Sequence, residues 1–203
     1  MANTKQSGAR RLKMAERAQQ QMDVMFPGIP HEWIWQRSKN DGYSTIPRTL
    51  PIAMQVIDNQ TKGKPAGHTL FCLWARSPDH PLVTIENPAT FASETGFQGE
   101  RAVHTWRQKM KKFAELGFII SREGPSGDFH YVLLANPNAA IERMRDHNLV
   151  QDGLYARFRD RVIDIGAYSD LENIQALWAR ERAEQATQAS INKKVAPPPP
   201  NAQ

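Results

Sequence analysis

The strongest local structural signals lie in residues 87–134, NPATFASETGFQGERAVHTWRQKMKKFAELGFIISREGPSGDFHYVLL. Asn87 followed by Pro88 is typical of a helix start, because asparagine caps the first free N–H groups and proline at the first helical position lacks an N–H of its own. Gly96 predicts the end of this helix, since glycine adopts the left-handed conformation of a C-terminal cap without strain. The stretch therefore opens with a short helix and a tight turn.

A second, longer helix is predicted over residues 99–116. Apolar residues recur there at the spacing that places them on one side of a helix: Val103, Trp106, Met110, Phe113 and Ala114. The same periodicity places a polar set on the opposite side: Arg101, Thr105, Gln108 and Lys112. One face is therefore expected to enter the core and the other to face outward.

The rest of the central region alternates between helix and strand signals. Residues 118–122 and 129–134 are rich in aromatic and β-branched residues and flank a Gly-Pro-Ser-Gly turn, which predicts a hairpin. Upstream, residues 66–75 form an apolar helical cluster and residues 82–85 a short strand. The predicted order is helix, strand, helix, turn, helix, strand, loop, strand.

The chain outside this region divides into flanking segments. Residues 1–28 read as a flexible basic arm followed by an amphipathic helix, the arm carrying Lys5, Arg10, Arg11 and Lys13. Residues 29–65 predict a short hairpin between residues 33 and 46, then a lead-in helix. Residues 66–136 form the central domain.

The C-terminal part is predicted to be helical and to end in a tail. Residues 137–190 carry apolar residues at helical spacing, so these helices either pack on the central domain or pair two subunits. Ser169 to Glu172 has the form of a capping box, which opens a helix with Leu171, Ile174, Leu177 and Trp178 inward. Residues 191–203 include four consecutive prolines and predict a disordered proline-rich tail.

Composition excludes several classes of protein. The 203 residues carry 26 Lys and Arg against 21 Asp and Glu, a formal charge of +5 that favours a polyanionic partner. With Cys72 as the single cysteine, no intrachain disulfide can form, which is typical of a reducing cytosol. No apolar run approaches the roughly 20 residues that span a bilayer. A cytoplasmic protein without membrane association is expected.

The order of elements over residues 66–136 resembles a winged helix-turn-helix domain, the DNA-binding architecture of many bacterial regulators and plasmid proteins. The resemblance implies a mainly α fold with a small β-hairpin wing, an α+β class with flanking helices. It makes residues 88–95 the positioning helix, residues 99–116 the recognition helix and residues 118–134 the wing.

The resemblance and the helical periodicity together assign candidate DNA contacts. Base edges in the major groove would meet Arg101, His104, Thr105 and Gln108, because an arginine fork suits guanine and a glutamine amide suits adenine. Phosphates would meet Arg107, Lys109, Lys111 and Lys112. The wing would contribute Arg122, Ser126 and His130.

The expected function is sequence-specific binding of double-stranded DNA by a homodimer that regulates transcription on a plasmid or other mobile element. Such a protein acts by occupying its DNA site and needs no cofactor. It is expected in the cytoplasm, associated with the nucleoid or a plasmid. No nucleotide-binding loop, serine-hydrolase elbow or zinc-protease motif occurs, and the histidines lack metal-ligand spacing, so neither catalysis nor a metal site is expected.

Three alternatives remain open from the sequence. A plasmid replication or partition accessory protein would use the same contacts. The run Gly96-Phe97-Gln98-Gly99 is a GXXG between two helices, an order that resembles a KH domain and implies RNA binding, although the loop lacks a basic residue. A winged helix can also serve as an interaction scaffold that touches no nucleic acid.

Overall fold

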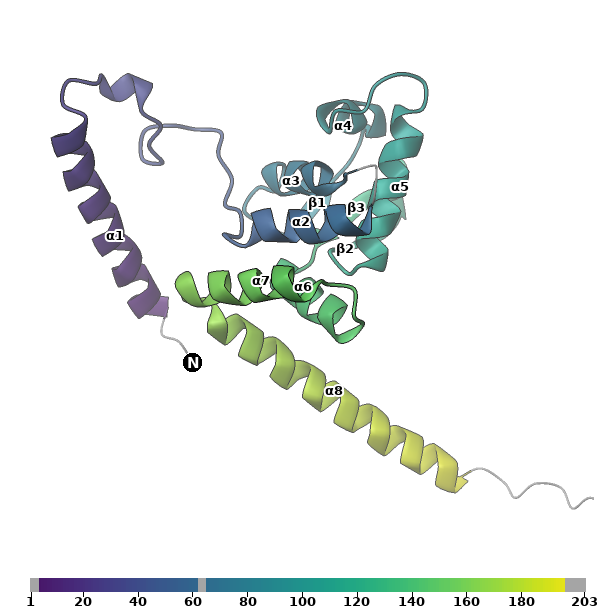
Figure 1. Cartoon of the computed structure of the whole chain (residues 1–203). Helices are drawn as coiled ribbons and strands as arrows, with labels where there is room; N and C mark the ends of the chain where they lie inside the picture. Colours follow the sequence, from purple (N-terminus) through teal and green to yellow (C-terminus); the bar gives the residue numbers. More distant parts are fainter. Residues whose placement is uncertain (1–3, 62–64, 196–203) are drawn as a thin grey trace, which may run out of the picture.

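The computed structural model describes residues 4–61 and 65–195, which form an α+β fold dominated by helices (Figure 1). Along the chain the elements are α1 (Thr4–Met25), the 3-10 helix η1 (His31–Trp33), α2 (Leu50–Gln60), α3 (Gly67–Ala75), β1 (Leu82–Thr84), α4 (Pro88–Glu94), α5 (Ala102–Glu115), β2 (Ile119–Gly124), β3 (Gly127–Leu134), α6 (Pro137–Asp146), α7 (Asp152–Asp164) and α8 (Tyr168–Val195). The predicted order of elements in the central domain is confirmed.

The described strands form an antiparallel sheet with the order β1-β3-β2. Val83 of β1 lies opposite Val132 of β3, and both are buried against the helices. On the other face, Leu82 and Ile120 both lie opposite Leu133, and all three remain partly exposed. The alternation of buried and exposed residues along the strands therefore gives the sheet one core face.

The helices that follow the sheet pack on the lead-in helix. Helices α6 and α7 both contact α2, and α8 begins against α6. The Thr49 hydroxyl donates to Oδ1 of Asn138 at 2.7 Å in the buried junction before α2. Residues 137–164 thus pack on α2, and α2 in turn packs on α3 of the central domain.

The N-terminal expectations need two corrections. The basic residues expected in a flexible arm lie within α1, so helix continues through them. The hairpin expected between residues 33 and 46 is wrong: η1 and a series of turns occupy this segment, in which the structure assigns no strand. Trp33, Ile34 and Trp35 have the alternation of a strand, but within the described residues no strand lies beside them to pair with.

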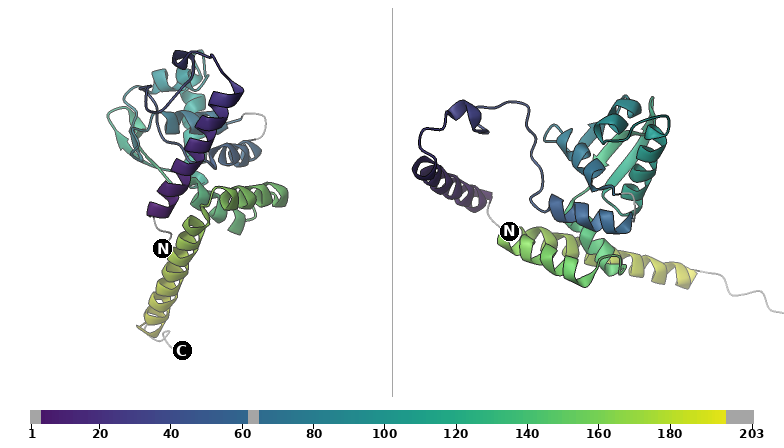
Figure 2. Two further views of the ribbon diagram at one scale, coloured as in Figure 1. Left: turned by 90° about the vertical axis from the view of Figure 1, so that its left-hand side faces the viewer. Right: turned by 45° about the horizontal axis from the view of Figure 1, so that its top comes forward.

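The C-terminal helix also differs from expectation. Helix α8 begins at Tyr168, one residue before the expected cap Ser169, so Ser169 lies inside the helix. Leu171 is buried as expected, but Leu177 is 51% exposed because α8 projects away from the other elements (Figures 1 and 2). The helix runs on to Val195, so residues 191–195 are helical, and the expected disordered tail otherwise lies outside the described residues.

The described part of the chain offers neither a membrane-spanning helix nor a metal-binding cluster. No helix there combines the length and apolarity that crossing a bilayer requires. Residues 4–61 and 65–195 also contain no group of three or more His, Cys, Asp or Glu side chains placed to bind a metal ion.

Candidate nucleic-acid interface

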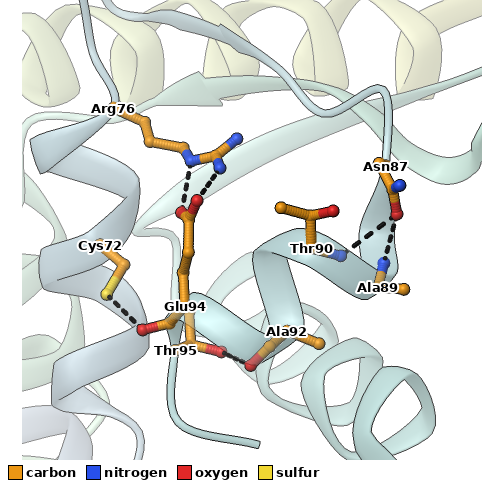
Figure 3. Close-up of polar contacts among 8 residues, drawn as sticks. All are labelled: Cys72, Arg76, Asn87, Ala89, Thr90, Ala92, Glu94 and Thr95. Carbon is orange, nitrogen blue, oxygen red and sulfur yellow. Dashed lines mark hydrogen bonds and ion pairs between the residues drawn. The ribbon is translucent and has the colours of Figure 1, made fainter.

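The position of α4 is fixed by polar contacts at both of its ends (Figure 3). At the start, Oδ1 of Asn87 accepts hydrogen bonds from the backbone N–H groups of Ala89 and Thr90 at 3.0 and 3.1 Å, as the cap signal predicts. At the end, Nε of Arg76 in the segment after α3 donates to Glu94 at 2.7 Å. This guanidinium holds the pKa of the Glu94 carboxyl below its usual value.

Buried aromatic rings connect α4 to α5 and to the wing, the β2–β3 hairpin. The Phe91 ring lies edge to face with Trp106, their centroids 5.8 Å apart, and Trp106 meets Phe129 in the same way at 6.0 Å. Between the two helices the chain turns at Gly96 and Gly99, whose φ angles of +86° and +78° strain any residue with a Cβ. The orientation of α5 is therefore set by its packing as well as by the turn.

Five polar side chains cover one side of the first three turns of α5 and its N-cap, and we call this surface the outward face. It consists of Arg101, His104, Arg107, Gln108 and Lys111, all exposed. At about 100° per residue these positions fall within about 120° of the helix circumference. The buried residues of α5 lie on the opposite side: Trp106, Lys109, Met110 and Phe113. Helix α5 is thus strongly two-sided.

The candidate base contacts occupy the N-terminal half of this surface, with two differences from expectation. The helix begins at Ala102 rather than at residue 99, so Arg101 is its N-cap and stands at the helix tip. His104 and Gln108 are exposed, whereas Thr105 is half-buried at the margin of the outward face. Arg101, His104 and Gln108 therefore lie together on the outward face, whereas Thr105 lies at its edge.

The candidate phosphate contacts divide into three groups. Arg107 and Lys111 are exposed on the outward face, as expected. Lys112 is half-buried, and its Nζ lies 3.1 Å from Oε2 of Glu115 in an ion pair. Lys109 is only 6% exposed, so it lies on the core side of α5 and not with Arg107 and Lys111 on the outward face.

The burial of Lys109 follows from its position in the helical repeat. It lies three residues after Trp106 and four before Phe113, which places it on the core side of α5. The helical spacing alone places residue 109 on the core side, but a charged lysine is normally expected at the surface. Conversely, Ala114 is exposed and Val103 only half-buried, although the apolar pattern places both in the core.

The wing residues mostly serve the wing itself. Ser126 donates its hydroxyl hydrogen to the Ile85 carbonyl, and its Oγ lies 2.9 Å from Nδ1 of His130, which is buried. Both Ser126 and His130, expected to meet DNA, are therefore engaged in hydrogen bonds inside the fold. Only Arg122 of the three is exposed, and the exposed acids Glu123 and Asp128 outnumber it on the hairpin.

A bulge explains why adjacent residues of β3 are both buried. Arg122 lies opposite Tyr131 and Gly124 opposite Gly127, so three residues of β3 stand against Glu123 alone. Strict alternation is broken there, and both Phe129 and His130 turn inward.

The wing also approaches the outward face. A Cβ placed on Gly127, whose φ is +110°, would lie 3.6 Å from Nη2 of Arg107. The Arg107 guanidinium therefore extends from α5 to the turn of the wing, a neighbour that the helical pattern alone does not identify. The positive charge at this junction comes from α5, because the hairpin itself carries more acids than bases.

Comparison of the chain with protein-family models, with curated protein sequences and with solved structures gave no significant match.

Proposed function

We propose that this protein binds double-stranded DNA in a sequence-specific manner, with α5 as the recognition helix. The observation that carries the proposal is the outward face of α5, which presents two arginines, a lysine, a histidine and a glutamine side by side and exposed. The major groove of B-DNA is about 12 Å wide and admits one α-helix. A helix buried on one side and cationic on the other fits that groove.

The chemistry of these side chains divides into base and backbone contacts. Arg101 at the helix tip has a fork that can pair with O6 and N7 of guanine, and the Gln108 amide can pair with adenine. Recognition helices enter the groove with their N-terminal residues, which suits the position of Arg101. Arg107 and Lys111 are suited to phosphates, where they contribute salt-dependent affinity and fix the register.

The described structure also favours α5 over the wing as the main contact. The hairpin carries Arg122 against Glu123 and Asp128, and its Ser126 and His130 bond within the fold. In this proposal the wing positions Arg107 and approaches the backbone chiefly through Arg122. The protein acts by occupancy, without a chemical step, as a homodimeric transcriptional regulator or a replication or partition protein of a plasmid or mobile element.

The test is selection of duplexes bound by the full chain from a random-sequence pool, followed by titration of the enriched duplex at several salt concentrations. The proposal expects enrichment of a defined sequence and a linear fall of log affinity with log salt, with a slope of about −0.9 for each phosphate contacted. Preferential binding of single-stranded RNA would favour the KH-like alternative and contradict the proposal. Absence of binding at low salt would favour a scaffold.

A further inference from the structure

The segment between α1 and α2 presents aromatic side chains to solvent. Trp33 is 84% exposed, Trp35 62% and Tyr43 42%, and we call these three residues the aromatic platform. The sequence favours core or interface packing for tryptophans, because each buries a large apolar area. The described chain covers neither Trp33 nor Trp35, so they do not pack in a core, and we interpret them as part of an interface.

The platform is held in a defined arrangement. Trp35 and Tyr43 meet edge to face with centroids 6.0 Å apart, and Cζ of Arg37 lies 5.1 Å from the centre of the Tyr43 ring. Next to Tyr43, the Ser44 hydroxyl donates to the Ser77 carbonyl at 2.6 Å, and the Thr45 N–H donates to Oδ1 of Asp79 at 2.6 Å. These bonds anchor one end of the segment to the loop between α3 and β1.

The same chain contains a sequence with the complementary chemistry. Residues 197–200 are four consecutive prolines, which favour a polyproline II conformation. Exposed aromatic surfaces recognise such segments, since the preformed helix loses little entropy and its rings pack flat on aromatic faces. A polyproline II backbone leaves its carbonyls free to accept hydrogen bonds. The indole N–H of a tryptophan can donate a hydrogen bond to such a carbonyl.

The geometry of α8 decides which copy of the chain supplies the prolines. Helix α8 has 28 residues and is therefore about 42 Å long. Pro200 lies five residues beyond its last residue, a span of at most about 18 Å even when fully extended. The end of α8 and the segment around η1 lie at opposite extremes of the molecule in each view (Figures 1 and 2). Helix α8 therefore leads away from the platform of its own chain, and a second copy is the source of prolines that this geometry favours.

We propose that the aromatic platform of one chain binds residues 197–200 of a second copy, so that the protein self-associates through its two extremities. The contact is head to tail, since the platform and the prolines are different surfaces. It is independent of DNA binding by α5, because none of its residues belongs to the outward face.

The experiment uses two full-length variants and sedimentation velocity over a concentration series. Trp35→Ala removes half of the aromatic pair, and a quadruple variant replaces Pro197, Pro198, Pro199 and Pro200 by Ala. We expect the parent to self-associate and each variant to do so at least tenfold more weakly. Phe26→Ala, which removes another exposed apolar side chain, is the matched control and should behave as the parent.

Mixing the two variants supplies the decisive result. One retains intact prolines and the other an intact platform, so an equimolar mixture should form a heterodimer with near-parental affinity. Circular dichroism checks that both variants are folded, which the exposure of the substituted tryptophan favours. A parent that stays monomeric, a proline variant that associates like the parent, or a mixture that stays monomeric would each overturn the proposal.

Discussion

Ser126 and His130 bond to each other at the turn of the wing, with Oγ 2.9 Å from Nδ1. A serine hydroxyl has a single hydrogen, and the Ile85 carbonyl can only accept one. Nδ1 of His130 must therefore carry a proton and donate to Ser126. This chain of bonds ties the turn of the hairpin to the end of β1, across 41 residues of sequence.

Removing the hydroxyl should loosen the wing. Ser126→Ala leaves the Ile85 carbonyl and the His130 N–H without this partner, so we expect a loss of about 1 kcal/mol in the free energy of unfolding. Urea denaturation followed by circular dichroism measures the change. Arg122→Ala, an exposed substitution on the same hairpin, should change the free energy by less than about 0.5 kcal/mol. Equal effects of the two substitutions would contradict a specific role for Ser126.

The outward face of α5 should separate specificity from affinity. We expect Arg101→Ala to relax base preference at one position of the selected duplex, with a loss of about 1–3 kcal/mol against the preferred base. Lys111→Ala should weaken binding to all duplexes alike and reduce the salt slope by about 1. Fluorescence anisotropy with matched and mismatched duplexes measures both effects.

The control for this pair is an arginine elsewhere on the molecule. Arg157 of α7 is exposed, and α7 packs on α2 rather than on α5. Arg157→Ala removes the same formal charge as either variant, so it should leave base preference and salt slope close to those of the parent. If it weakened binding as much as Lys111→Ala, net charge rather than α5 would account for the affinity.

Substitution by alanine should have opposite effects on stability at two glycines. A Cβ on Gly67 would lie 2.7 Å from Cβ of Met54, since α3 begins in close contact with α2. We expect Gly67→Ala to destabilise the fold by about 1–3 kcal/mol through overpacking. Gly153 in α7 has open space around the added methyl, so Gly153→Ala should stabilise by about 0.4–1 kcal/mol. Thermal unfolding of the two variants compares them directly, and a shift of both in one direction would contradict this account.

The ion pair between Arg76 and Glu94 should make stability depend on pH. Because the pKa of Glu94 is lower in the folded chain than its ordinary value of 4.5, its contribution is present at neutral pH. That contribution is lost as the pH falls below 4.5 through the folded pKa. Since both side chains are more than a third exposed, the effect should not exceed about 1 kcal/mol.

Denaturation of the parent and of Glu94→Gln between pH 7 and pH 3 tests this expectation. The parent should be the more stable at pH 7, and the difference should close in acid. Glu123→Gln, which removes an exposed wing carboxylate, should follow the parent at every pH. A parent-to-variant difference for Glu94→Gln that stays constant with pH would exclude the ion pair as its cause.

Helix and strand order in the central domain followed from the sequence because the signals are local. Asn87 caps a helix that begins at the next residue, and the glycine that ends it lies nine residues on. The alternation of buried and outward positions in α5 depends only on residue spacing, so the exposed set that includes Arg101 and Gln108 was predictable. Such signals need no knowledge of distant parts of the chain.

The tertiary structure decided which side chains remain available. Ser126 and His130 read as surface residues of a turn until β1 brings the Ile85 carbonyl beside them. Trp33 and Trp35 are of a residue type that usually packs in a core. They are exposed because no element of the described chain covers them. Spacing along the chain determines the face on which a residue lies, whereas its partners come from segments tens of residues away, and only folding brings those together.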